Sequence, residues 1–332
     1  MKLLVTGGYG FIGSNYVRGL LESNGEASVR VVDKLSYGSN LENLSDLAKS
    51  KRFEFINGDI ADAALMEKCS RDVDAIVNFA AESHVDRSIA DPWPFLDSNV
   101  RGVVTILEAL RKRRDSVRML QVSTDEVYGD VVRGSSSETD LLRPSSPYAA
   151  SKAASDLYCM SYHRTYGTDV VITRCTNNFG RYQFPEKLIP KAIIRASLGL
   201  KVPVYGTGKN TRDWIHVDDH CDAINLALRK GRSGEVYNAA GGNERANLEL
   251  VRTILKVMSK PEGVIELVED RPGHDTRYSL DAGKISRELG WKPRRKFDDG
   301  LEETVGWYLK NKDWWKPLAT DQILSAAPWK KA

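Results

Sequence analysis

A glycine-rich loop near the start of the chain limits the folds that this sequence can adopt. Residues 2–6 read KLLVT, a short apolar run, and residues 7–13 follow directly as GGYGFIG. Glycines at positions 7, 10 and 13 permit a tight turn, the approach of a phosphate to the backbone, and close packing of the next helix. The sequence therefore predicts a strand, a turn and a helix over residues 13–22, with the helix N-terminus facing an anion.

A carboxylate ends the second predicted strand, 20 residues beyond Gly13. Asp33 stands where it would hydrogen-bond the ribose hydroxyls of a dinucleotide, and it would repel a 2′-phosphate. The pattern favours NAD over NADP as the cofactor, and the alternative is a glycine turn beside a surface aspartate. The cofactor residues expected here are Gly7, Gly10, Phe11, Ile12, Gly13 and Asp33.

The ends of the third and fourth predicted strands also carry residues that we expect to contact the dinucleotide. Asp59 and Ile60 follow the third predicted strand, where a loop would meet the adenine, although a simple turn aspartate is the alternative. The segment after the fourth strand has small residues that let a dinucleotide pass, although packing against a helix would explain them equally well. Its residues are Phe79, Ala80, Ala81 and Glu82.

The first half of the chain alternates short strand-like runs with longer helix-like stretches, which is typical of a parallel sheet covered by helices. Beyond about residue 175 the alternation loosens and prolines interrupt it, with a return to the sheet expected around residues 235–239. The sequence predicts an α/β fold: a Rossmann-type doubly wound parallel sheet with a smaller, mixed C-terminal substrate lobe. We expect residues 1–175 and about 215–240 in the first lobe, and 176–214 and 241–320 in the second. The strands are expected at 2–6, 28–32, 53–57, 75–79, 118–123 and 169–175, and further helices at 99–111 and 149–165.

Composition excludes several classes of partner. The 332 residues carry 48 basic and 45 acidic side chains, a net charge of +3 that is too small to indicate nucleic acid. No apolar run approaches the roughly 20 residues of a membrane helix, and Met1 leads directly into the first strand without a signal peptide. The four cysteines are widely spaced, so we expect free thiols and a cytoplasmic protein.

Two short segments carry candidate catalytic groups. Tyr148 and Lys152 lie four residues apart, on one face of a predicted helix. An adjacent ammonium would lower the tyrosine pKa, which would make the phenolate a usable base, although a structural helix pair is the default. Thr124, Asp125 and Glu126 follow a predicted strand, and the two carboxylates exceed what oxidation of an alcohol requires. The alternative is that these residues only cap the N-terminus of a helix.

Together these residues resemble a known family. The chain is similar to the extended short-chain dehydrogenase/reductases of the NAD-dependent epimerase/dehydratase family, and within it to the dTDP-glucose 4,6-dehydratases. The likeness runs from residue 2 to about residue 307. It rests on the glycine loop, the 124–126 triplet, the Tyr148–Lys152 pair, and the runs AAESHVDRS (80–88), NNFG (177–180), FPEKLIP (184–190), RDW (212–214) and RPGHD (271–275).

The resemblance implies a hydro-lyase with resident NAD that converts dTDP-glucose to a 4-keto-6-deoxy sugar for deoxysugar synthesis, such as rhamnose for surface polysaccharide. It implies catalytic roles for Thr124, Asp125, Glu126, Tyr148 and Lys152, and a homodimer. It also implies that Lys34, Leu35, Ser98 and Asn178, with Tyr148 and Lys152, contact the cofactor. The implied substrate residues are Ser83, Thr124, Asn177, Lys187, Leu188, Pro203, Tyr205, Arg212, Asn247, Arg271 and His274.

Other interpretations stay open at this stage. A UDP-sugar 4-epimerase, a UDP-glucuronate decarboxylase or a UDP- or CDP-glucose 4,6-dehydratase would share the fingerprint, and a non-catalytic dinucleotide-binding scaffold would share the fold. A GDP-mannose 4,6-dehydratase is disfavoured by Asp33, because that relative uses NADP. His216 and His220 are spaced like metal ligands, but no third ligand or general-base motif accompanies them, so we expect no metal.

Overall fold

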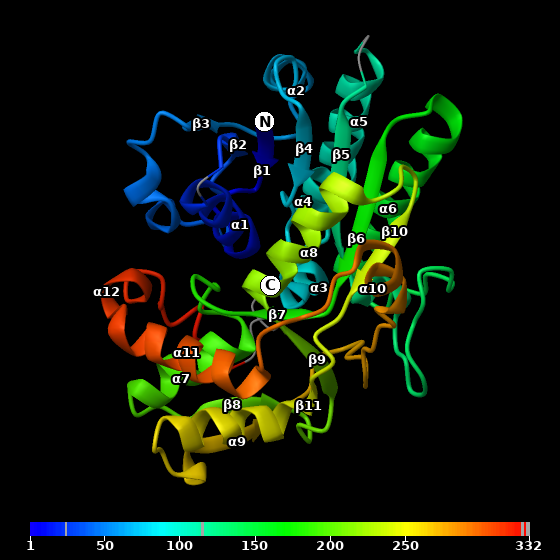
Figure 1. Cartoon of the computed structure of the whole chain (residues 1–332). Coiled ribbons are helices and arrows are strands. Elements are labelled where there is room, and N and C mark those ends of the chain that lie inside the picture. The colour runs from blue at the N-terminus through cyan, green and yellow to red at the C-terminus, as the bar shows by residue number, and fades with distance from the viewer. Residues whose placement is uncertain (24, 114–115, 327–328, 330–332) are drawn as a thin grey trace.

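The structure is a computed structural model, and it describes residues 1–332 except 24, 114–115, 327–328 and 330–332. Its centre is a parallel sheet of seven strands in the order β10-β6-β5-β4-β1-β2-β3 (Figure 1). This confirms the predicted doubly wound sheet, including the late return to it. The strands are β1 (Lys2–Thr6), β2 (Ser28–Asp33), β3 (Phe53–Asn57), β4 (Ala75–Asn78), β5 (Arg118–Thr124), β6 (Val170–Cys175) and β10 (Val236–Ala239).

Helices cover both faces of this sheet because both faces are apolar. In β1, Leu3 and Val5 join one core and Leu4 joins the other, as the two-residue period of a strand requires. The first core is shared with α1 (Phe11–Glu22), α8 (Val217–Lys230) and α10 (Gly283–Leu289). The second is shared with α2 (Ala63–Cys69), α5 (Gly102–Arg111) and α6 (Pro147–Tyr166).

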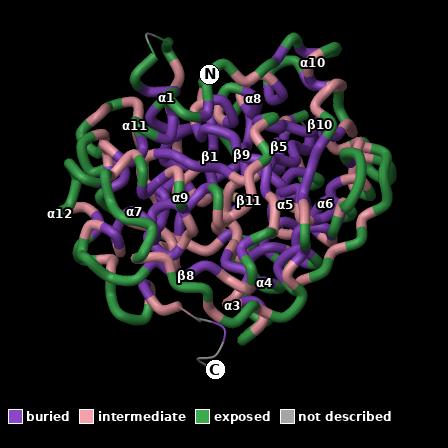
Figure 2. The backbone as a smooth tube through the Cα atoms, turned by 90° about the horizontal axis from the view of Figure 1, so that it is seen from below, coloured by how far each residue is buried: buried purple, intermediate pink, exposed green. Residues whose placement is uncertain are grey.

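A second, smaller lobe lies at the carboxyl ends of the strands, below the sheet in Figure 1. It contains a mixed three-stranded sheet of β7 (Asn177–Phe179), β9 (Thr211–His216) and β11 (Glu244–Ala246), and a pair formed by β8 (Val202–Tyr205) and β12 (Ile265–Val268). Its separate core is closed by α7 (Leu188–Ser197), α9 (Asn247–Val257) and α11 (Phe297–Lys310). Figure 2 shows the buried segments through the middle of the molecule and the exposed ones around its rim.

Short elements connect these units. They are the helices α3 (Val85–Ala90), α4 (Trp93–Phe95) and α12 (Lys312–Trp315), a π-helical segment (Leu96–Arg101), and the 3-10 helices at Leu41–Asn43, Ser45–Leu47, Asp125–Tyr128 and Glu262–Val264. Within the described residues, no helix has both the length and the apolar character that crossing a bilayer requires.

Several element boundaries differ from the sequence expectations by one or more residues. The helix expected over residues 99–111 is π-helical up to Arg101, and only then α-helical. The first helix begins at Phe11, inside the glycine loop, and β5 extends to Thr124. The division into lobes remains a proposal; in the structure Ile285 and Leu289 of α10 pack in the core of the large sheet, and Ala282 packs against the same core.

Candidate active site

A continuous cleft runs along the junction of the two lobes. Its first cavity is lined by the glycine loop and by the carboxyl ends of β2, β4 and β5, and its second by residues of the smaller lobe. His84, Glu126, Asn177 and Lys187 line both cavities, so the two halves join at these side chains. Open α/β sheets bind ligands at this edge.

The glycine loop can exist only with glycine at its two tightest positions. Gly7 has a φ of +69°, and a Cβ there would lie 2.5 Å from the backbone nitrogen of Ala80. A Cβ at Gly13 would lie 2.3 Å from the carbonyl oxygen of Gly7. Gly10 is the N-cap of α1 and offers no side-chain cap, so amides of the first helical turn remain available to an anion. The loop is therefore a cradle suited to the pyrophosphate of a dinucleotide.

Asp33 lies at the end of β2, buried at the rim of the first cavity. Its carboxylate accepts the backbone N–H groups of Tyr9 (2.9 Å) and Leu35 (2.8 Å) and the hydroxyl of Ser39 (3.1 Å). Burial raises the pKa of this carboxyl above its usual value despite these hydrogen bonds. The side chain thus fixes the glycine loop and the next loop together, and lies where a ribose would be held.

The predicted cofactor residues converge on this cavity with two exceptions. Leu35 and Glu82 are not among the lining residues. The backbone N–H of Leu35 serves Asp33 instead, and Glu82 accepts the hydroxyl of Ser36 at 3.0 Å. The predicted residues that do line the cavity are Gly7, Gly10, Phe11, Ile12, Gly13, Asp33, Lys34, Asp59, Ile60, Phe79, Ala80, Ala81, Ser98, Tyr148, Lys152 and Asn178.

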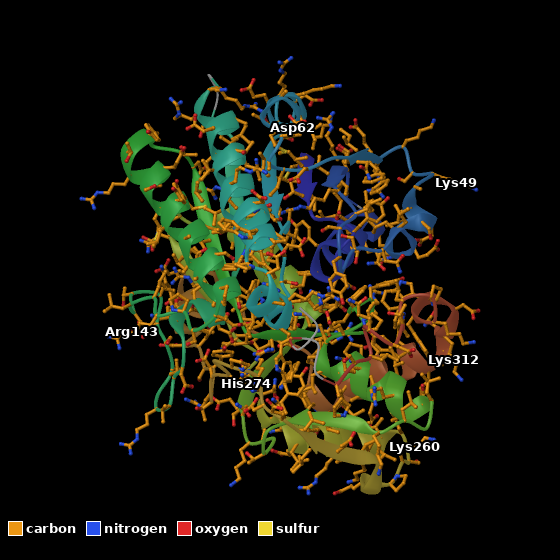
Figure 3. The ribbon with its side chains drawn as sticks, turned by 180° about the vertical axis from the view of Figure 1, so that it is seen from behind. Lys49, Asp62, Arg143, Lys260, His274 and Lys312 are labelled. Atoms are coloured by element: carbon orange, nitrogen blue, oxygen red, sulfur yellow. The ribbon has the colours of Figure 1, made fainter. Side chains whose placement is uncertain are left out.

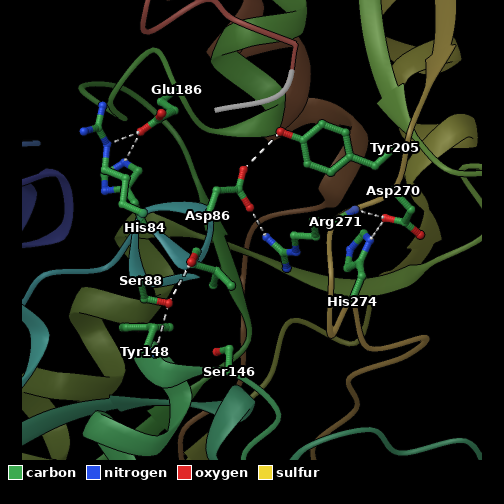
Figure 4. Close-up of polar contacts among 12 residues, drawn as sticks. His84, Asp86, Ser88, Ser146, Tyr148, Glu186, Tyr205, Asp270, Arg271 and His274 are labelled. Carbon is green, nitrogen blue, oxygen red and sulfur yellow. Dashed lines mark hydrogen bonds and ion pairs between the residues drawn. The ribbon is translucent and has the colours of Figure 1, made fainter. Parts of the chain in front are cut away.

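Tyr148 and Lys152 project into the same cavity from the first turns of α6. The backbone N–H of Tyr148 donates to the hydroxyl of Ser88 at 3.1 Å, as Figure 4 shows. The Lys152 ammonium donates to the carbonyl of Val122 at 2.7 Å, and burial lowers the pKa of this lysine. The backbone of Tyr148 and the ammonium of Lys152 are therefore held in place before any ligand enters.

The direction of the Tyr148 pKa corrects the expectation from the motif. We expected Lys152 to lower it, but burial, followed by the carboxyls of Glu126 and Asp125, raises the Tyr148 pKa well above its usual value. A hydrogen bond with Thr124 acts in the opposite direction and is outweighed. In the protein without ligand the phenol therefore stays protonated at neutral pH.

Thr124, Asp125 and Glu126 follow one another at the end of β5. The Thr124 hydroxyl accepts the backbone N–H of Glu126 (3.3 Å) and donates to Asp125 Oδ1 (3.1 Å), so it caps the short 3-10 helix. Asp125 is only 3% exposed, and Asp125 Oδ2 and Glu126 Oε2 are buried without a hydrogen-bond partner among the described residues. The two carboxyls therefore face the cleft and not solvent, unlike those of an exposed helix cap.

Their environments separate the two carboxyls chemically. Burial, and then the neighbouring Glu126, raises the pKa of Asp125 well above its usual range, which keeps that group protonated. Burial also raises the pKa of Glu126, but the cations of Arg271, Lys187 and Arg212 oppose that rise. One acid is therefore held neutral while the other has cations to stabilise its ionised form.

The second cavity collects the predicted substrate residues from several loops. Arg271 contributes a guanidinium whose Nε is buried without a partner among the described residues, and Lys187 donates to the carbonyl of Ser83 at 2.7 Å. In Figure 3, His274 lies between the lobes, whereas Lys260 and Lys312 lie at the outside of the smaller lobe. The predicted residues that line one or both cavities are Ser83, Thr124, Asn177, Lys187, Leu188, Pro203, Tyr205, Arg212, Asn247, Arg271 and His274.

The sequence expectations missed several lining residues. His84 and Asp86 lay inside a quoted motif but were given no role, and Glu186 precedes an expected substrate lysine. Tyr37 lies four residues after Asp33, and this closeness in the sequence could have identified it as a lining residue. No local pattern indicated Tyr278. The lining residues missed in this way include Ser36, Tyr37, Gly38, Ser39, His84, Asp86, Gln183, Phe184, Glu186, Lys191 and Tyr278.

The two histidines that resemble metal ligands have structural contacts. His216 caps α8 by accepting the backbone N–H of Asp218 at 3.2 Å. His220 is buried and lies 2.9 Å from the side-chain oxygen of Asn178, which orients that amide beside the first cavity. Among the residues that the structure describes, no group of three His, Cys, Asp or Glu side chains could hold a metal ion.

Comparison with known proteins gives a consistent family. Residues 4–304 match the family model described as GDP-mannose 4,6 dehydratase. A dTDP-glucose 4,6-dehydratase of Actinoplanes sp. is 51% identical over 320 residues, 95% of this chain and 100% of that protein. The Escherichia coli dTDP-glucose 4,6-dehydratase is 44% identical, over 95% of this chain and 96% of that protein.

Solved structures point to the same group. DesIV, a dTDP-glucose 4,6-dehydratase from Streptomyces venezuelae with NAD and TYD bound, has a TM-score of 0.94 and 51% identity, and the match covers 96% of this chain and 100% of that chain. A UDP-glucuronic acid 4-epimerase from Bacillus cereus has a TM-score of 0.88 at 28% identity, over 93% of this chain and 99% of that chain. Identity of 44–51% over nearly whole chains shows that this protein belongs to the dTDP-glucose 4,6-dehydratase family.

Proposed function

We propose that this protein is an NAD-dependent hydro-lyase that converts dTDP-glucose to dTDP-4-keto-6-deoxyglucose. The observation that carries the proposal is the pair of buried carboxyls, Asp125 and Glu126, beside Tyr148 in one cleft. Oxidation or epimerisation needs only the tyrosine and its lysine, whereas loss of water needs an acid and a base in addition. The named activity of the relatives at 44–51% identity supports the same conclusion.

The cofactor half of the cleft fits NAD. The glycine cradle leaves space where a Cβ would collide with backbone, and Asp33 places a carboxyl where a 2′-phosphate would be repelled. NAD bound there would supply a hydride acceptor for C4 of the sugar and a hydride donor for C6, so the reaction would have no net redox change. DesIV and a Bacillus anthracis dTDP-glucose 4,6-dehydratase, each solved with NAD, support this assignment.

In the first step the residues around Tyr148 remove a proton from the C4 hydroxyl. The phenolate form of Tyr148 accepts that proton, with the Thr124 hydroxyl and the Lys152 ammonium stabilising the charge. The Ser88 contact holds the backbone of Tyr148, and the Val122 contact holds the ammonium of Lys152. The product of the step is a ketone at C4.

In the second step the carboxyls eliminate water. The C4 ketone acidifies the proton at C5, and Glu126, with nearby cations to stabilise its carboxylate, removes it. Asp125, held protonated by burial, gives its proton to the departing C6 hydroxyl, which leaves as water. Once C6 has been reduced, Glu126 returns a proton to C5, which completes the balance.

The second cavity suits the nucleoside diphosphate. Arg212, Arg271 and Lys187 supply cationic donors for the diphosphate, and Asn247, His274 and the Pro203–Tyr205 strand supply a surface for the base. The preference for dTDP over UDP or CDP rests on the named substrate of the relatives. Kinetic comparison of the three glucose nucleotides will test it, and equal kcat/KM values would remove the preference.

The decisive experiment follows the hydrogens. Purified protein with dTDP-glucose in deuterated water should give a 4-keto-6-deoxy product with deuterium at C5, and a C4-deuterated substrate should place that label at C6 of the same molecule. A product with inverted C4 and an intact C6 hydroxyl would identify an epimerase instead. Binding without conversion would identify a non-catalytic dinucleotide-binding protein.

We also propose that the protein is a homodimer. Large apolar side chains are exposed near α5 and on α6: Trp93 (70%), Leu96 (45%), Leu157 (56%) and Tyr166 (55%). Surface of this kind favours association with an equivalent surface. Analytical ultracentrifugation should give a dimer and the variant Leu157→Glu a monomer, whereas a wild-type monomer would contradict the proposal.

The setting that we propose is the cytoplasm, in the synthesis of deoxysugars such as rhamnose for surface polysaccharide. The four cysteines are free, and Cys69, Cys159 and Cys175 are buried, which suits a reducing compartment. Cell fractionation should recover the protein with cytosolic enzymes, and recovery from the medium would contradict this location.

A further inference from the structure

One loop of the cofactor cavity is joined directly to the opposite lobe. Residues 36–39 line the first cavity and lie between the end of β2 and the first 3-10 helix. Two residues of this loop have left-handed backbone conformations, Leu35 with a φ of 55° and Gly38 with a φ of 91°. The loop thereby leaves the sheet and carries Tyr37 toward the smaller lobe.

Tyr37 is held there by polar contacts with two charged side chains. Its hydroxyl donates to Glu186 Oε2 at 2.6 Å, and the guanidinium carbon of Arg87 lies 3.4 Å from the centroid of its ring. Arg87 Nε donates to the same Glu186 oxygen at 3.3 Å. The three side chains therefore bind one another in a closed triangle, which we call the Tyr37 clasp.

Aromatic rings complete the packing around the clasp. Tyr37 meets the rings of His84 and Phe184 edge to face, each with centroids 4.9 Å apart. His84 Nε2 lies 3.5 Å from Glu186, and the two side chains lie together in Figure 4. Burial lowers the pKa of His84 well below its usual value, so its ring is neutral in this cluster. The Glu186 side chain is only 5% exposed, so these contacts are largely shielded from solvent.

The clasp joins three segments that are far apart in sequence. Tyr37 belongs to the loop after β2, Arg87 to α3, and Glu186 to the segment that leads into α7 of the smaller lobe. Tyr37, His84 and Phe184 line the cavity that contains the glycine loop, whereas Glu186 faces the second cavity. The contacts therefore form part of a cavity wall that crosses from one lobe to the other.

We propose that the Tyr37 clasp retains the dinucleotide by holding this wall closed, so that the reduced cofactor stays bound until the hydride returns to the sugar. The inference rests on the proposed function, because only a reaction that returns its hydride to the same sugar fails when the cofactor leaves midway. An ordinary dehydrogenase would gain nothing from such a clasp, since it must release its reduced cofactor. The clasp residues act on cofactor release and take no part in the chemical steps.

The test compares Tyr37→Phe, which removes the hydroxyl and keeps the ring over Arg87, with Tyr37→Ala, which removes both. The control is Tyr237→Phe, which removes a phenol–carboxylate hydrogen bond of 3.1 Å to Glu288, outside the cleft. Each protein is purified with its NAD, and exchange of bound NAD against excess isotope-labelled NAD is measured without substrate. Loss of a hydrogen bond to a charged group should speed exchange by about tenfold in Tyr37→Phe, and further in Tyr37→Ala, with the control unchanged.

A second measurement separates the clasp from the reaction. During turnover of dTDP-glucose, Tyr37→Phe should release NADH and leave the 4-keto sugar that still carries its C6 hydroxyl, whereas the wild type should release neither. Wild-type exchange rates in Tyr37→Phe, or equal acceleration in the control, would overturn the clasp. Tyr37-dependent exchange in a protein that does not dehydrate dTDP-glucose would support the clasp as a retaining device and refute the proposed reaction.

Discussion

Replacing Asp125 by asparagine should slow dehydration and stabilise the protein at the same time. Burial and Glu126 keep Asp125 protonated in the folded protein, whereas in the unfolded chain the same group ionises near its ordinary pKa of about 3.9. Folding of the wild type above that pH must therefore take up a proton. An asparagine is neutral in both states, and its side-chain oxygen can still accept the Thr124 hydroxyl, a contact of 3.1 Å in the wild type.

The sign and size of the stability change follow from this linkage. The contribution of a group with a raised folded pKa is fully present below the unfolded pKa, and is lost as pH rises toward the folded value. The loss is at most about 1.4 kcal/mol per pH unit. The free energy of unfolding of Asp125→Asn should therefore exceed that of the wild type by a margin that grows from pH 4 upward, as urea denaturation at a series of pH values will measure.

The activity should change in the opposite direction. Loss of a positioned proton donor typically costs about 10²–10⁴-fold in rate, which corresponds to about 3–5 kcal/mol of activation free energy. Single-turnover experiments with mass spectrometry should show C4 oxidation but slow loss of water, and Asp140→Asn, an exposed carboxylate in a nearby loop, should behave as wild type. Dehydration by Asp125→Asn at the wild-type rate would refute the role of Asp125 as the acid. If the free energies of unfolding of Asp125→Asn and the wild type differ by the same amount at every pH, Asp125 is not held protonated in the folded protein.

Three further changes test separate parts of the protein. The variant Glu126→Gln should still oxidise C4 but should stall before water is lost, so that NADH accumulates and can be measured by absorbance. Dehydration by this variant at the full rate would show that Glu126 is not the base. Gly7→Ala, whose Cβ would lie 2.5 Å from a backbone nitrogen, should abolish bound NAD in the purified protein, whereas Gly19→Ala, with nothing within 4 Å, should keep it. Asp156→Asn leaves the buried guanidinium of Arg174, 2.8 Å away and 1% exposed, without its counter-charge, and should cost about 3–5 kcal/mol of unfolding free energy by chemical denaturation. A change below 1 kcal/mol would show that Arg174 finds compensation elsewhere.

Local periodicity explains how much of the fold the sequence could predict. Strands of a parallel sheet buried on both faces are nearly continuous apolar runs, and β1, β4 and β6 each contain three consecutive apolar residues. The π-helical residues 96–101 carry no such signature, because a π-helical turn depends on a single extra residue inside a helix. The place of α10 depends on its partner, β10, which packs against it from 44 or more residues earlier in the chain.

The same difference between local sequence patterns and contacts of distant residues applies to the site. The glycine loop, Thr124–Glu126 and the Tyr148–Lys152 pair are each contained within a few residues, so their patterns could be recognised in the sequence. Tyr37 and Glu186 are 149 residues apart, and only the folded chain brings them within 2.6 Å of each other. The direction of the Tyr148 pKa was predicted wrongly for the same reason, since it is set by burial and by Glu126 and Asp125, which lie on the 3-10 helix after β5.

The raised pKa of Tyr148 has a consequence for how the site is activated. In the ligand-free protein burial keeps the phenol and Asp125 protonated, so the Tyr148 phenolate needed for C4 oxidation is scarce. Oxidised nicotinamide carries a positive charge, and such a charge inside the same low-dielectric cavity opposes the effect of the two carboxyls on Tyr148. Oxidised cofactor, when bound, would therefore lower the Tyr148 pKa and favour the phenolate, whereas the reduced cofactor, which lacks this charge, would not. Such a balance would favour the Tyr148 base only when a hydride acceptor is in place beside it.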